Sequence, residues 1–297
     1  MLASETSIKC RTVTEISSNV TPELFSKAVF VEEELKKCEK VLVAFSGGVD
    51  STLVALMAKM AVGENAVAVT AESPSLAKNE LAETSRLARE IGIKHFIIKT
   101  DELNDPNYRA NPTNRCYFCK KELAEKLKAL SERFGGYAIV DGTNAEDMTM
   151  HRPGAAALSE EGVRRPLAEA GLSKAEVRDL ARAFGLPNHD KPSSPCLSSR
   201  VAYGEIITPE RLRRVEAAES LVRSLTGVKE LRVRDHGTLA RIEVAKDERK
   251  FFFDEKLLDT ISGSLRELGF VHVAFDMDGY RSGSLNETSS AMRDRKQ

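Results

Sequence analysis

The loop at residues 46–51 combines residue types that suit a bound phosphate, and it reads Ser46, Gly47, Gly48, Val49, Asp50 and Ser51. The two glycines let backbone N–H groups close on an anion, and a helix predicted from residue 52 adds its positive N-terminal dipole. Asp50 supplies a carboxylate oxygen, the kind of ligand that Mg²⁺ prefers. The loop matches neither G-x-x-x-x-G-K-[ST] nor G-x-G-x-x-G, and short glycine loops are common. A tight turn capped by Ser51 is therefore the structural alternative to a phosphate site.

Three cysteines form a second group of residues that could carry chemistry. Cys116 and Cys119 make a C-x-x-C pair, and Cys196 follows much later, within the stretch 191–200. A structural zinc site needs a fourth ligand, for which His189 is the nearest candidate in the sequence. A redox dithiol needs only the pair. A four-iron four-sulfur cluster held by three cysteines leaves one iron open to substrate or sulfide. The residue types alone leave these three interpretations open.

Two arginines form the third group. Arg232 and Arg234 are two residues apart on a predicted strand, so both side chains point to one face of a sheet. Paired guanidinium groups suit a phosphate or a carboxylate, and Ser199 and Arg200 could add a second contact to an anion. The alternative is a charged strand face in contact with solvent.

The elements that must position these residues alternate along the first 200 positions. Short apolar runs at 41–45, 66–70, 95–99 and 137–140 predict strands, and helical periodicity appears at 22–37, 52–60 and 76–90. This alternation predicts an α/β fold with a doubly wound, mostly parallel sheet. Ligands in such sheets bind beyond the carboxyl ends of the strands, where the loop 46–51 and a second loop at 141–144 both fall.

The character of the chain changes after residue 200. Helices are predicted at 208–225 and 255–268, a hairpin at 230–234 and 239–244, and a further strand at 271–275. The sequence therefore predicts a flexible tail at 1–21, an α/β domain at 22–200 and a small α+β domain at 201–297, which would serve substrate binding or oligomerisation.

Composition narrows the class of protein. The 297 residues carry 44 Lys and Arg against 45 Asp and Glu, and the C-terminal module from residue 205 holds 17 of each sign. Balanced charge argues against a stable complex with nucleic acid. Five cysteines in a chain of this length do not suit a secreted disulfide framework. No signal peptide is evident, and no apolar stretch approaches the ~20 residues that cross a bilayer. We expect a cytoplasmic protein without a membrane partner.

The motif S-G-G-x-D-S at 46–51 resembles the signature of the PP-loop ATP pyrophosphatase superfamily. Its members cleave ATP between the α- and β-phosphates and transfer AMP to a carboxylate or carbonyl oxygen of the substrate. The resemblance implies that ATP and Mg²⁺ are cofactors and that the loop holds the departing pyrophosphate. It also implies that Gly142 and Thr143 close the nucleotide pocket from the far side.

The stretch 165–200, with S-S-P-C-L-S-S-R at its end, resembles the ATP-dependent sulfur transferases of nickel-pincer cofactor biosynthesis, the lactate racemase maturation family. The resemblance extends through Arg232 and Arg234 and covers most of the chain after the tail. It implies a small mononucleotide substrate, pyridinium-3,5-biscarboxylic acid mononucleotide, whose carboxylates become thiocarboxylates. It further implies that both arginines, with Ser199 and Arg200, bind the phosphate or carboxylate of this substrate, and that the protein is a homo-oligomer.

Two branches of that family differ in their source of sulfur. One branch carries only the cysteine that matches Cys196 and gives up its sulfur, leaving dehydroalanine. The pair Cys116 and Cys119 departs from that pattern and matches the branch in which three cysteines hold a 4Fe–4S cluster. The resemblance therefore implies catalytic transfer of sulfide from an external donor. The rivals are sacrificial transfer from Cys196, a tRNA thiolase, an amidating ligase and a zinc-stabilised nucleotide-binding module.

Overall fold

A four-stranded parallel sheet forms the centre of the first of two compact units. The computed structural model describes residues 12–149 and 153–281, and this unit comprises the described residues up to 100 together with 116–194. The strands are β1 (Val41–Ala44), β2 (Ala66–Glu72), β3 (Lys94–Lys99) and β4 (Ala138–Val140), in the order β3-β2-β1-β4. All neighbouring pairs are parallel, which confirms the predicted sheet.

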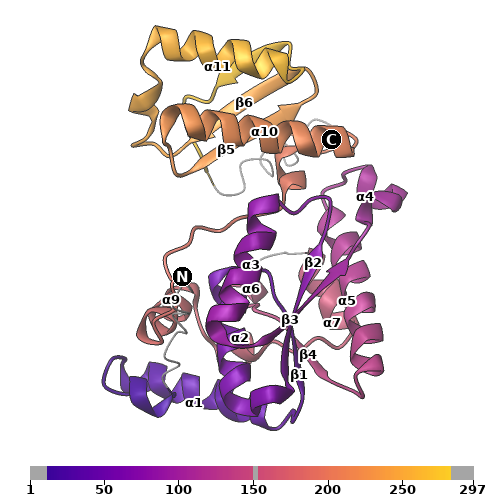
Figure 1. Ribbon diagram of the computed structural model, residues 1–297, viewed down its shortest axis with the longest axis vertical. Helices are drawn as coiled ribbons and strands as arrows, with labels where there is room; N and C mark the ends of the chain where they lie inside the picture. The colour runs from indigo at the N-terminus through magenta and orange to yellow at the C-terminus, as the bar shows by residue number, and fades with distance from the viewer. Residues whose placement is uncertain (1–11, 150–152, 282–297) are drawn as a thin grey trace, which may run out of the picture. The chain divides into compact units, whose positions relative to one another are not determined.

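Successive residues of β1 face opposite sides of the sheet and enter two separate hydrophobic clusters. Val41 and Val43 belong to one cluster, whereas Leu42 packs with Leu127 on the other face. The longer helices that contribute to the first cluster are α1 (Pro22–Lys36), α2 (Val49–Val62), α3 (Lys78–Ile91) and α9 (Lys174–Ala183). Helix α5 (Arg115–Arg133) covers the second face (Figure 1). Burial on both faces explains why β1 and most of β2 read as continuous apolar runs.

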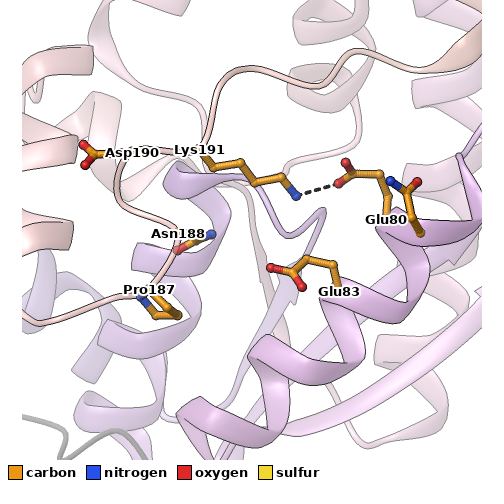
Figure 2. A pocket seen from close by; sticks show the side chains of 7 residues that line it. Glu80, Glu83, Pro187, Asn188, Asp190 and Lys191 are labelled. Atoms are coloured by element: carbon orange, nitrogen blue, oxygen red, sulfur yellow. Dashed lines mark hydrogen bonds and ion pairs between the residues drawn. The ribbon is translucent and has the colours of Figure 1, made fainter. Parts of the chain in front are cut away.

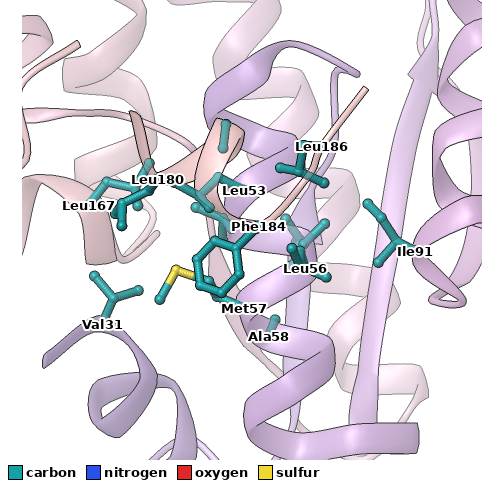
Figure 3. Packing of buried hydrophobic residues seen from close by; sticks show 14 of the residues in the cluster. Val31, Leu53, Leu56, Met57, Ala58, Ile91, Leu167, Leu180, Phe184 and Leu186 are labelled. Atoms are coloured by element: carbon teal, nitrogen blue, oxygen red, sulfur yellow. The ribbon is translucent and has the colours of Figure 1, made fainter. Parts of the chain in front are cut away.

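Helix α2 is surrounded by apolar side chains along most of its length. Figure 3 shows Met57 of α2 close to Val31 of α1 and to Phe184, the residue that follows α9. All three side chains are fully or almost fully buried. This packing fixes the axis of α2, and with it the position of the helix N-terminus that follows the loop 46–51.

Helix α1 begins as the sequence predicts, and residues 12–21 before it pack against the first unit. Thr21 accepts a hydrogen bond from the Leu24 amide at 3.2 Å, and Pro22 occupies the first helical position. Val13 and Ile16 are buried in the main cluster, and residues 14–16 form a 3₁₀ turn. The expectation of a flexible tail is therefore wrong for residues 12–21, because two apolar side chains anchor them. Residues 1–11 lie outside the described part of the chain.

The direction in which the chain extends the sheet reverses between β1 and β4. From β1 the chain moves outward to β2 and β3, and it returns to β4 on the opposite side of β1. The loops after β1 and β4 therefore follow neighbouring parallel strands at a topological switch point, the usual ligand position in this fold class.

The second unit contains residues 101–115 and the described residues from 195 onward. Its sheet runs β5-β6-β7, with β5 and β6 antiparallel and β6 and β7 parallel. The elements are α4 (Pro106–Arg109), α10 (Pro209–Thr226), α11 (Glu255–Glu267), β5 (Leu231–His236), β6 (Leu239–Val244) and β7 (His272–Phe275). The hairpin and both long helices match the sequence prediction. The inclusion of residues 101–115 does not follow from the sequence, and it rests on contacts such as those from the buried Asn111 amide to the carbonyl oxygens of Val201 and Ala202.

Short elements complete the two units: η1 (Thr14–Ile16), η2 (Gly63–Asn65), η3 (Glu102–Asn104), α6 (Ala145–Thr149), α7 (Pro153–Glu160), α8 (Pro166–Glu169), η4 (Leu197–Arg200) and η5 (Arg249–Phe252). In residues 12–149 and 153–281, none of the helices has both the length and the apolar character that a membrane crossing requires.

Candidate active site

The loop between β1 and α2 is held by its own hydroxyl groups. The Ser46 amide donates to Ser51 Oγ at 3.2 Å, and Ser51 Oγ lies 3.2 Å from the Gly48 carbonyl oxygen, to which it donates. Thr52 Oγ1 donates to the same carbonyl at 2.8 Å. Gly47 has φ +70°, a conformation that favours glycine. The predicted glycine loop is thus a rigid turn that opens directly onto the N-terminus of α2, as an anion site requires.

Asp50 lies in the first turn of α2 and has one carboxylate oxygen to spare. Its Oδ2 contacts the Lys174 ammonium group from α9. Its Oδ1 is buried and has no hydrogen-bond partner among the described residues. A buried carboxylate oxygen without a partner costs free energy unless a ligand satisfies it. The oxygen donor and its place beside the anion loop fit Mg²⁺, which binds through one or two carboxylates and the phosphates of a nucleotide.

The loop after β4 packs directly on the phosphate loop. A Cβ atom added to Gly142 would lie 2.6 Å from the Ser51 nitrogen, so only glycine permits this approach. Thr143 donates from its amide and its hydroxyl to Asp141, at 2.8 Å and 2.9 Å. Burial raises the pKa of Asp141, and the two Thr143 hydrogen bonds oppose that rise. The structure therefore brings the predicted residue Gly142 onto the loop 46–51, and the next residue, Thr143, holds the Asp141 carboxylate.

A third segment, residues 187–191, also borders the phosphate loop, and it was not predicted from the sequence. The Asn188 side chain donates from Nδ2 to the Gly47 carbonyl oxygen at 3.2 Å. Lys191 pairs with Glu80 of α3 at 2.6 Å across a cavity of about 440 Å³ that Glu83 also lines (Figure 2). The only signal in the sequence is proximity to Cys196, which does not reveal a contact with the glycine loop.

The two cysteines of the C-x-x-C pair lie in the first two turns of α5. Cys116 is exposed, Cys119 is partly buried, and the Cys119 thiol lies 3.4 Å from the Cys116 carbonyl oxygen, to which it donates. Spacing of three residues on one helical turn lets both thiols reach one metal centre. A Cβ added to Gly154 would lie 3.1 Å from the Cys116 carbonyl oxygen, so α7 packs closely here.

Cys196 belongs to the second unit, whereas Cys116 and Cys119 belong to the first. The Cys196 carbonyl oxygen accepts from the Ser199 amide at 2.9 Å, which begins the 3₁₀ turn η4. Within residues 12–149 and 153–281, no group of three or more His, Cys, Asp or Glu side chains is arranged to hold a metal ion. Each of the three thiols is a donor of the kind that iron–sulfur clusters use, and a cluster shared by them stays a prediction.

His189 is not placed to complete a zinc site. Its Nδ1 lies 2.9 Å from the Leu186 carbonyl oxygen, and its Nε2 lies 2.9 Å from Asp190 Oδ2. Both ring nitrogens are therefore engaged by oxygen atoms from neighbouring residues. This geometry counts against the zinc interpretation, which needs a fourth ligand besides the three cysteines.

The predicted arginines of the second unit share one face of its sheet. Arg232 lies opposite Glu243 in the β5–β6 register, and Arg234 contacts Glu243 Oε2 at 2.8 Å. Opposite residues of paired strands project to the same side, which confirms the expected common face. Arg234 also donates to the Ser199 carbonyl oxygen at 2.9 Å.

Arg200 is buried beside these strands and has an acidic partner. Its Nε lies 2.8 Å from Glu219 Oε1, and its Nη1 donates to Ser199 Oγ at 3.1 Å. Burial lowers the pKa of Arg232, and the positive charge of Arg200 lowers it further. Ion pairs and hydrogen bonds connect much of this cluster, which comprises Arg200, Arg223, Arg232, Arg234 and Arg241 against Glu219, Glu243 and Asp276. The cluster has an excess of positive charge, which favours an anionic ligand.

The fold and the site define a class of protein. A parallel α/β sheet whose switch point carries S-G-G-V-D-S, with a second glycine loop packed on it, is a nucleotide-binding domain of the PP-loop type. In agreement, the family profile described as NAD synthase matches residues 24–123.

Full-length relatives narrow the class. The chain is 46% identical over 263 residues to an uncharacterized protein of Synechocystis sp., covering 89% of this chain and 98% of the relative. It is 37% identical over 266 residues to the pyridinium-3,5-bisthiocarboxylic acid mononucleotide synthase of Lactiplantibacillus plantarum, covering 89% and 95%. A subunit of the glutamine-hydrolysing GMP synthase of Methanococcus maripaludis is 30% identical over 223 residues, covering 67% and 70%. The chain belongs to the PP-loop family that contains the pyridinium-3,5-bisthiocarboxylic acid mononucleotide synthase, which confirms the resemblance seen in the sequence.

Proposed function

We propose that the protein is an ATP-dependent sulfur transferase that converts the carboxylates of pyridinium-3,5-biscarboxylic acid mononucleotide to thiocarboxylates. One observation carries this proposal. The chain is 37% identical to a relative named as a synthase of the bisthiocarboxylic product and aligns with 95% of it. The loop 46–51 at the sheet's switch point gives further support. ATP is the nucleotide that PP-loop proteins use, and the loop geometry suits its departing pyrophosphate.

The first half of the reaction forms an acyl-adenylate. A carboxylate oxygen of the substrate attacks the α-phosphorus of ATP, and the bond from that phosphorus to the bridging oxygen breaks. Pyrophosphate leaves with the electron pair and is bound by the N–H groups of the loop 46–51 and by the dipole of α2. Asp50 would hold Mg²⁺ through its buried Oδ1, and the ion would neutralise charge on the phosphates.

The second half replaces the activated oxygen by sulfur. A sulfide nucleophile attacks the acyl carbon, the bond from that carbon to the AMP oxygen breaks, and AMP departs with the electron pair. We propose that Cys116, Cys119 and Cys196 hold a 4Fe–4S cluster, which when bound supplies an open iron where sulfide from an external donor can bind. The exposed position of Cys116 supports access from solvent.

The arginine cluster of the second unit is our candidate for the substrate phosphate. We propose Arg232 and Arg234 as the main contacts, with Ser199 and Arg200 beside them. The support is an excess of buried positive charge on one sheet face, where guanidinium groups suit a phosphate. From the family resemblance we also propose a homo-oligomer that works in the cytoplasm, which the mass of the native particle and fractionation of cells would test.

The experiment uses the full chain, reconstituted anaerobically with iron and sulfide. The protein receives ATP, Mg²⁺, sulfide and the dicarboxylate mononucleotide, and mass spectrometry follows both the product and Cys196. We expect several thiocarboxylates per chain with Cys196 unchanged. Cys196→Ser should abolish thiolation while ATP–pyrophosphate exchange continues, and Cys38→Ser is the matched control because Cys38 lies at the end of α1. One turnover by cluster-free protein, with Cys196 converted to dehydroalanine, would establish the sacrificial route instead.

A further inference from the structure

Asn188 has hydrogen bonds that point to a role in the phosphate loop. Its Nδ2 donates to the Gly47 carbonyl oxygen at 3.2 Å and to Thr52 Oγ1 at 2.9 Å. Thr52 Oγ1 in turn donates to the Gly48 carbonyl oxygen at 2.8 Å. One buried amide therefore contacts the Gly47 carbonyl directly and the Gly48 carbonyl through one hydroxyl. We propose that Asn188 is a positioning residue for pyrophosphate, an inference that rests on the proposed function.

The geometry of the peptide bond explains how the amide acts on an anion. In a trans peptide the C=O and the following N–H point in opposite directions. Holding the Gly47 carbonyl toward Asn188 therefore turns the Gly48 N–H to the opposite side of the peptide, away from Asn188. The Gly48 carbonyl and the Val49 N–H have the same relation, and the Thr52 amide and Ser51 Oγ hold that carbonyl as well. The Gly48 N–H donates to Ser46 Oγ over a long distance of 3.5 Å, so it can be redirected to a phosphate oxygen.

The orientation of the amide is fixed on both sides. Nδ2 faces two oxygen atoms, so a flip would place Oδ1 against the Gly47 carbonyl oxygen. Oδ1 is itself buried without a hydrogen-bond partner among the described residues. An apolar side chain would avoid that cost, so Asn188 is a poor choice for packing alone. The role of Asn188 is therefore to donate two hydrogen bonds, to the Gly47 carbonyl and to Thr52 Oγ1.

The segment that carries Asn188 is clamped in place. Arg178 of α9 donates from Nη1 to the His189 carbonyl oxygen at 3.0 Å and from Nη2 to that of Lys191 at 2.9 Å. Lys191 reaches across to Glu80 of α3, as Figure 2 shows. These contacts hold the backbone of residues 189–191, so the Asn188 side chain extends from a fixed backbone. The segment thus supports the loop from outside the strand–loop–helix unit.

The test compares two substitutions that change charge identically at the same cavity. Asn188→Asp keeps the size of the side chain but replaces the Nδ2 donor by an oxygen that faces the Gly47 carbonyl. Asn79→Asp places the same charge on an exposed residue that lines the cavity. Calorimetric titration of the full chain should show inorganic pyrophosphate binding at least about tenfold weaker in the first variant, as expected for losing a buried hydrogen bond. AMP affinity, and pyrophosphate affinity of Asn79→Asp, should stay within about twofold.

A second pair of variants keeps the test decisive if Asn188→Asp does not fold. Thr52→Val preserves shape and removes the hydroxyl that connects Asn188 to the Gly48 carbonyl. It should also weaken pyrophosphate binding. The double variant Asn188→Ala with Thr52→Val should lose less affinity than the product of the two single losses, because the two side chains form one network. Equal weakening of AMP and pyrophosphate, or strictly independent losses, would overturn the inference. Wild-type protein that binds pyrophosphate but makes no thiocarboxylate would sink the proposed function alone.

Discussion

Gly47 and Gly142 are two positions at which the site accepts no side chain, and the physical reasons differ. Gly47 has φ +70°, and an added Cβ would lie 2.8 Å from Thr84 Cγ2 on α3. Gly142 is not in the left-handed region, yet an added Cβ would lie 2.6 Å from the backbone nitrogen of Ser51. The first glycine allows a turn, whereas the second allows two loops to touch. Only the first role is readable from the motif itself.

The close contact at Gly142 predicts that one added methyl group impairs the nucleotide site. Gly142→Ala should lower the rate of ATP–pyrophosphate exchange by at least about 100-fold, because the methyl group must push the 141–144 loop away from the first turn of α2. A shift of about 1 Å in a positioned group is enough for such a loss. Exchange is measured with labelled pyrophosphate at saturating substrate.

The matched control for Gly142 is Gly263 on α11. It is exposed, and an added Cβ meets nothing within 4 Å. Gly263→Ala should raise the free energy of unfolding by about 0.5–1 kcal/mol through helix propensity and leave exchange unchanged. Full exchange activity in Gly142→Ala would show that the two loops do not need this close approach.

The N-terminal cap of helix α9 positions a residue that contacts the phosphate loop. Ser173 accepts from the Glu176 amide at 3.3 Å, and Glu176 accepts from the Ser173 amide at 2.8 Å, which forms a capping box. The next residue, Lys174, contacts Asp50 of the phosphate loop. The cap therefore fixes where α9 begins, and this places the Lys174 ammonium group beside the loop.

Loss of that cap should lower the free energy of unfolding by a measurable amount. Ser173→Ala should lower the free energy of unfolding in urea by about 1 kcal/mol, the usual value of an N-cap side chain. Ser26→Ala, on the exposed face of α1, should change it by no more than about 0.5 kcal/mol. Equal effects of the two substitutions would mean that the capping box does not contribute.

Strand β3 carries a histidine that makes stability depend on pH. Thr70 Oγ1 donates to the Phe45 carbonyl oxygen at 2.7 Å and so accepts from His95 Nε2, which lies 2.8 Å away. Burial lowers the pKa of His95 below its ordinary value of 6.5. The unfolded chain therefore takes up this proton at higher pH than the folded protein does.

The sign of the effect follows from that difference. As pH falls below about 6.5, the unfolded state gains protons first, so the free energy of unfolding decreases until the folded pKa is reached. His95→Gln should flatten the decline between about pH 7 and 5 without abolishing it, because burial also lowers the pKa of His236 in the second unit. Chemical unfolding at a series of pH values checks this, and an unchanged slope in His95→Gln would contradict it.

At the scale of the whole molecule, the sequence predicts the parts that depend on local pattern. The apolar run 41–45 and the glycine loop after it define a parallel strand, a turn and a helix start, so the nucleotide side of the site was predictable. Helix α5 is absent from the predicted elements although Leu123, Leu127 and Leu130 have helical spacing, so a local pattern for it exists. Asn188 and the grouping of residues 101–115 with the C-terminal part depend on contacts between residues far apart in the chain, for which a sequence has no local signal.

The buried ion pairs of the second unit also join residues that are far apart in the sequence, such as Arg200 and Glu219. Glu219 lies between Arg200 and Arg223 and also accepts from the Val233 amide at 3.2 Å. Burial by itself would raise the pKa of Glu219, but hydrogen bonding and charge from Arg200, followed by the charge of Arg223, hold it below the ordinary range. The carboxylate therefore stays ionised at neutral pH and balances part of the cluster's positive charge.

Removing this charge should damage one unit more than the other. Glu219→Gln leaves Arg200 buried with reduced compensation, so we expect a loss of about 3–5 kcal/mol in the stability of the second unit. The first unit has its own hydrophobic core and its own phosphate loop, so at 25 °C pyrophosphate binding should be retained. Hydrogen exchange resolved by peptide separates the two responses, with the exposed Glu267→Gln as control. Equal loss of protection in β1 and β5 would show that the two cores unfold as one, and that the charge balance of the arginine cluster supports the nucleotide site as well.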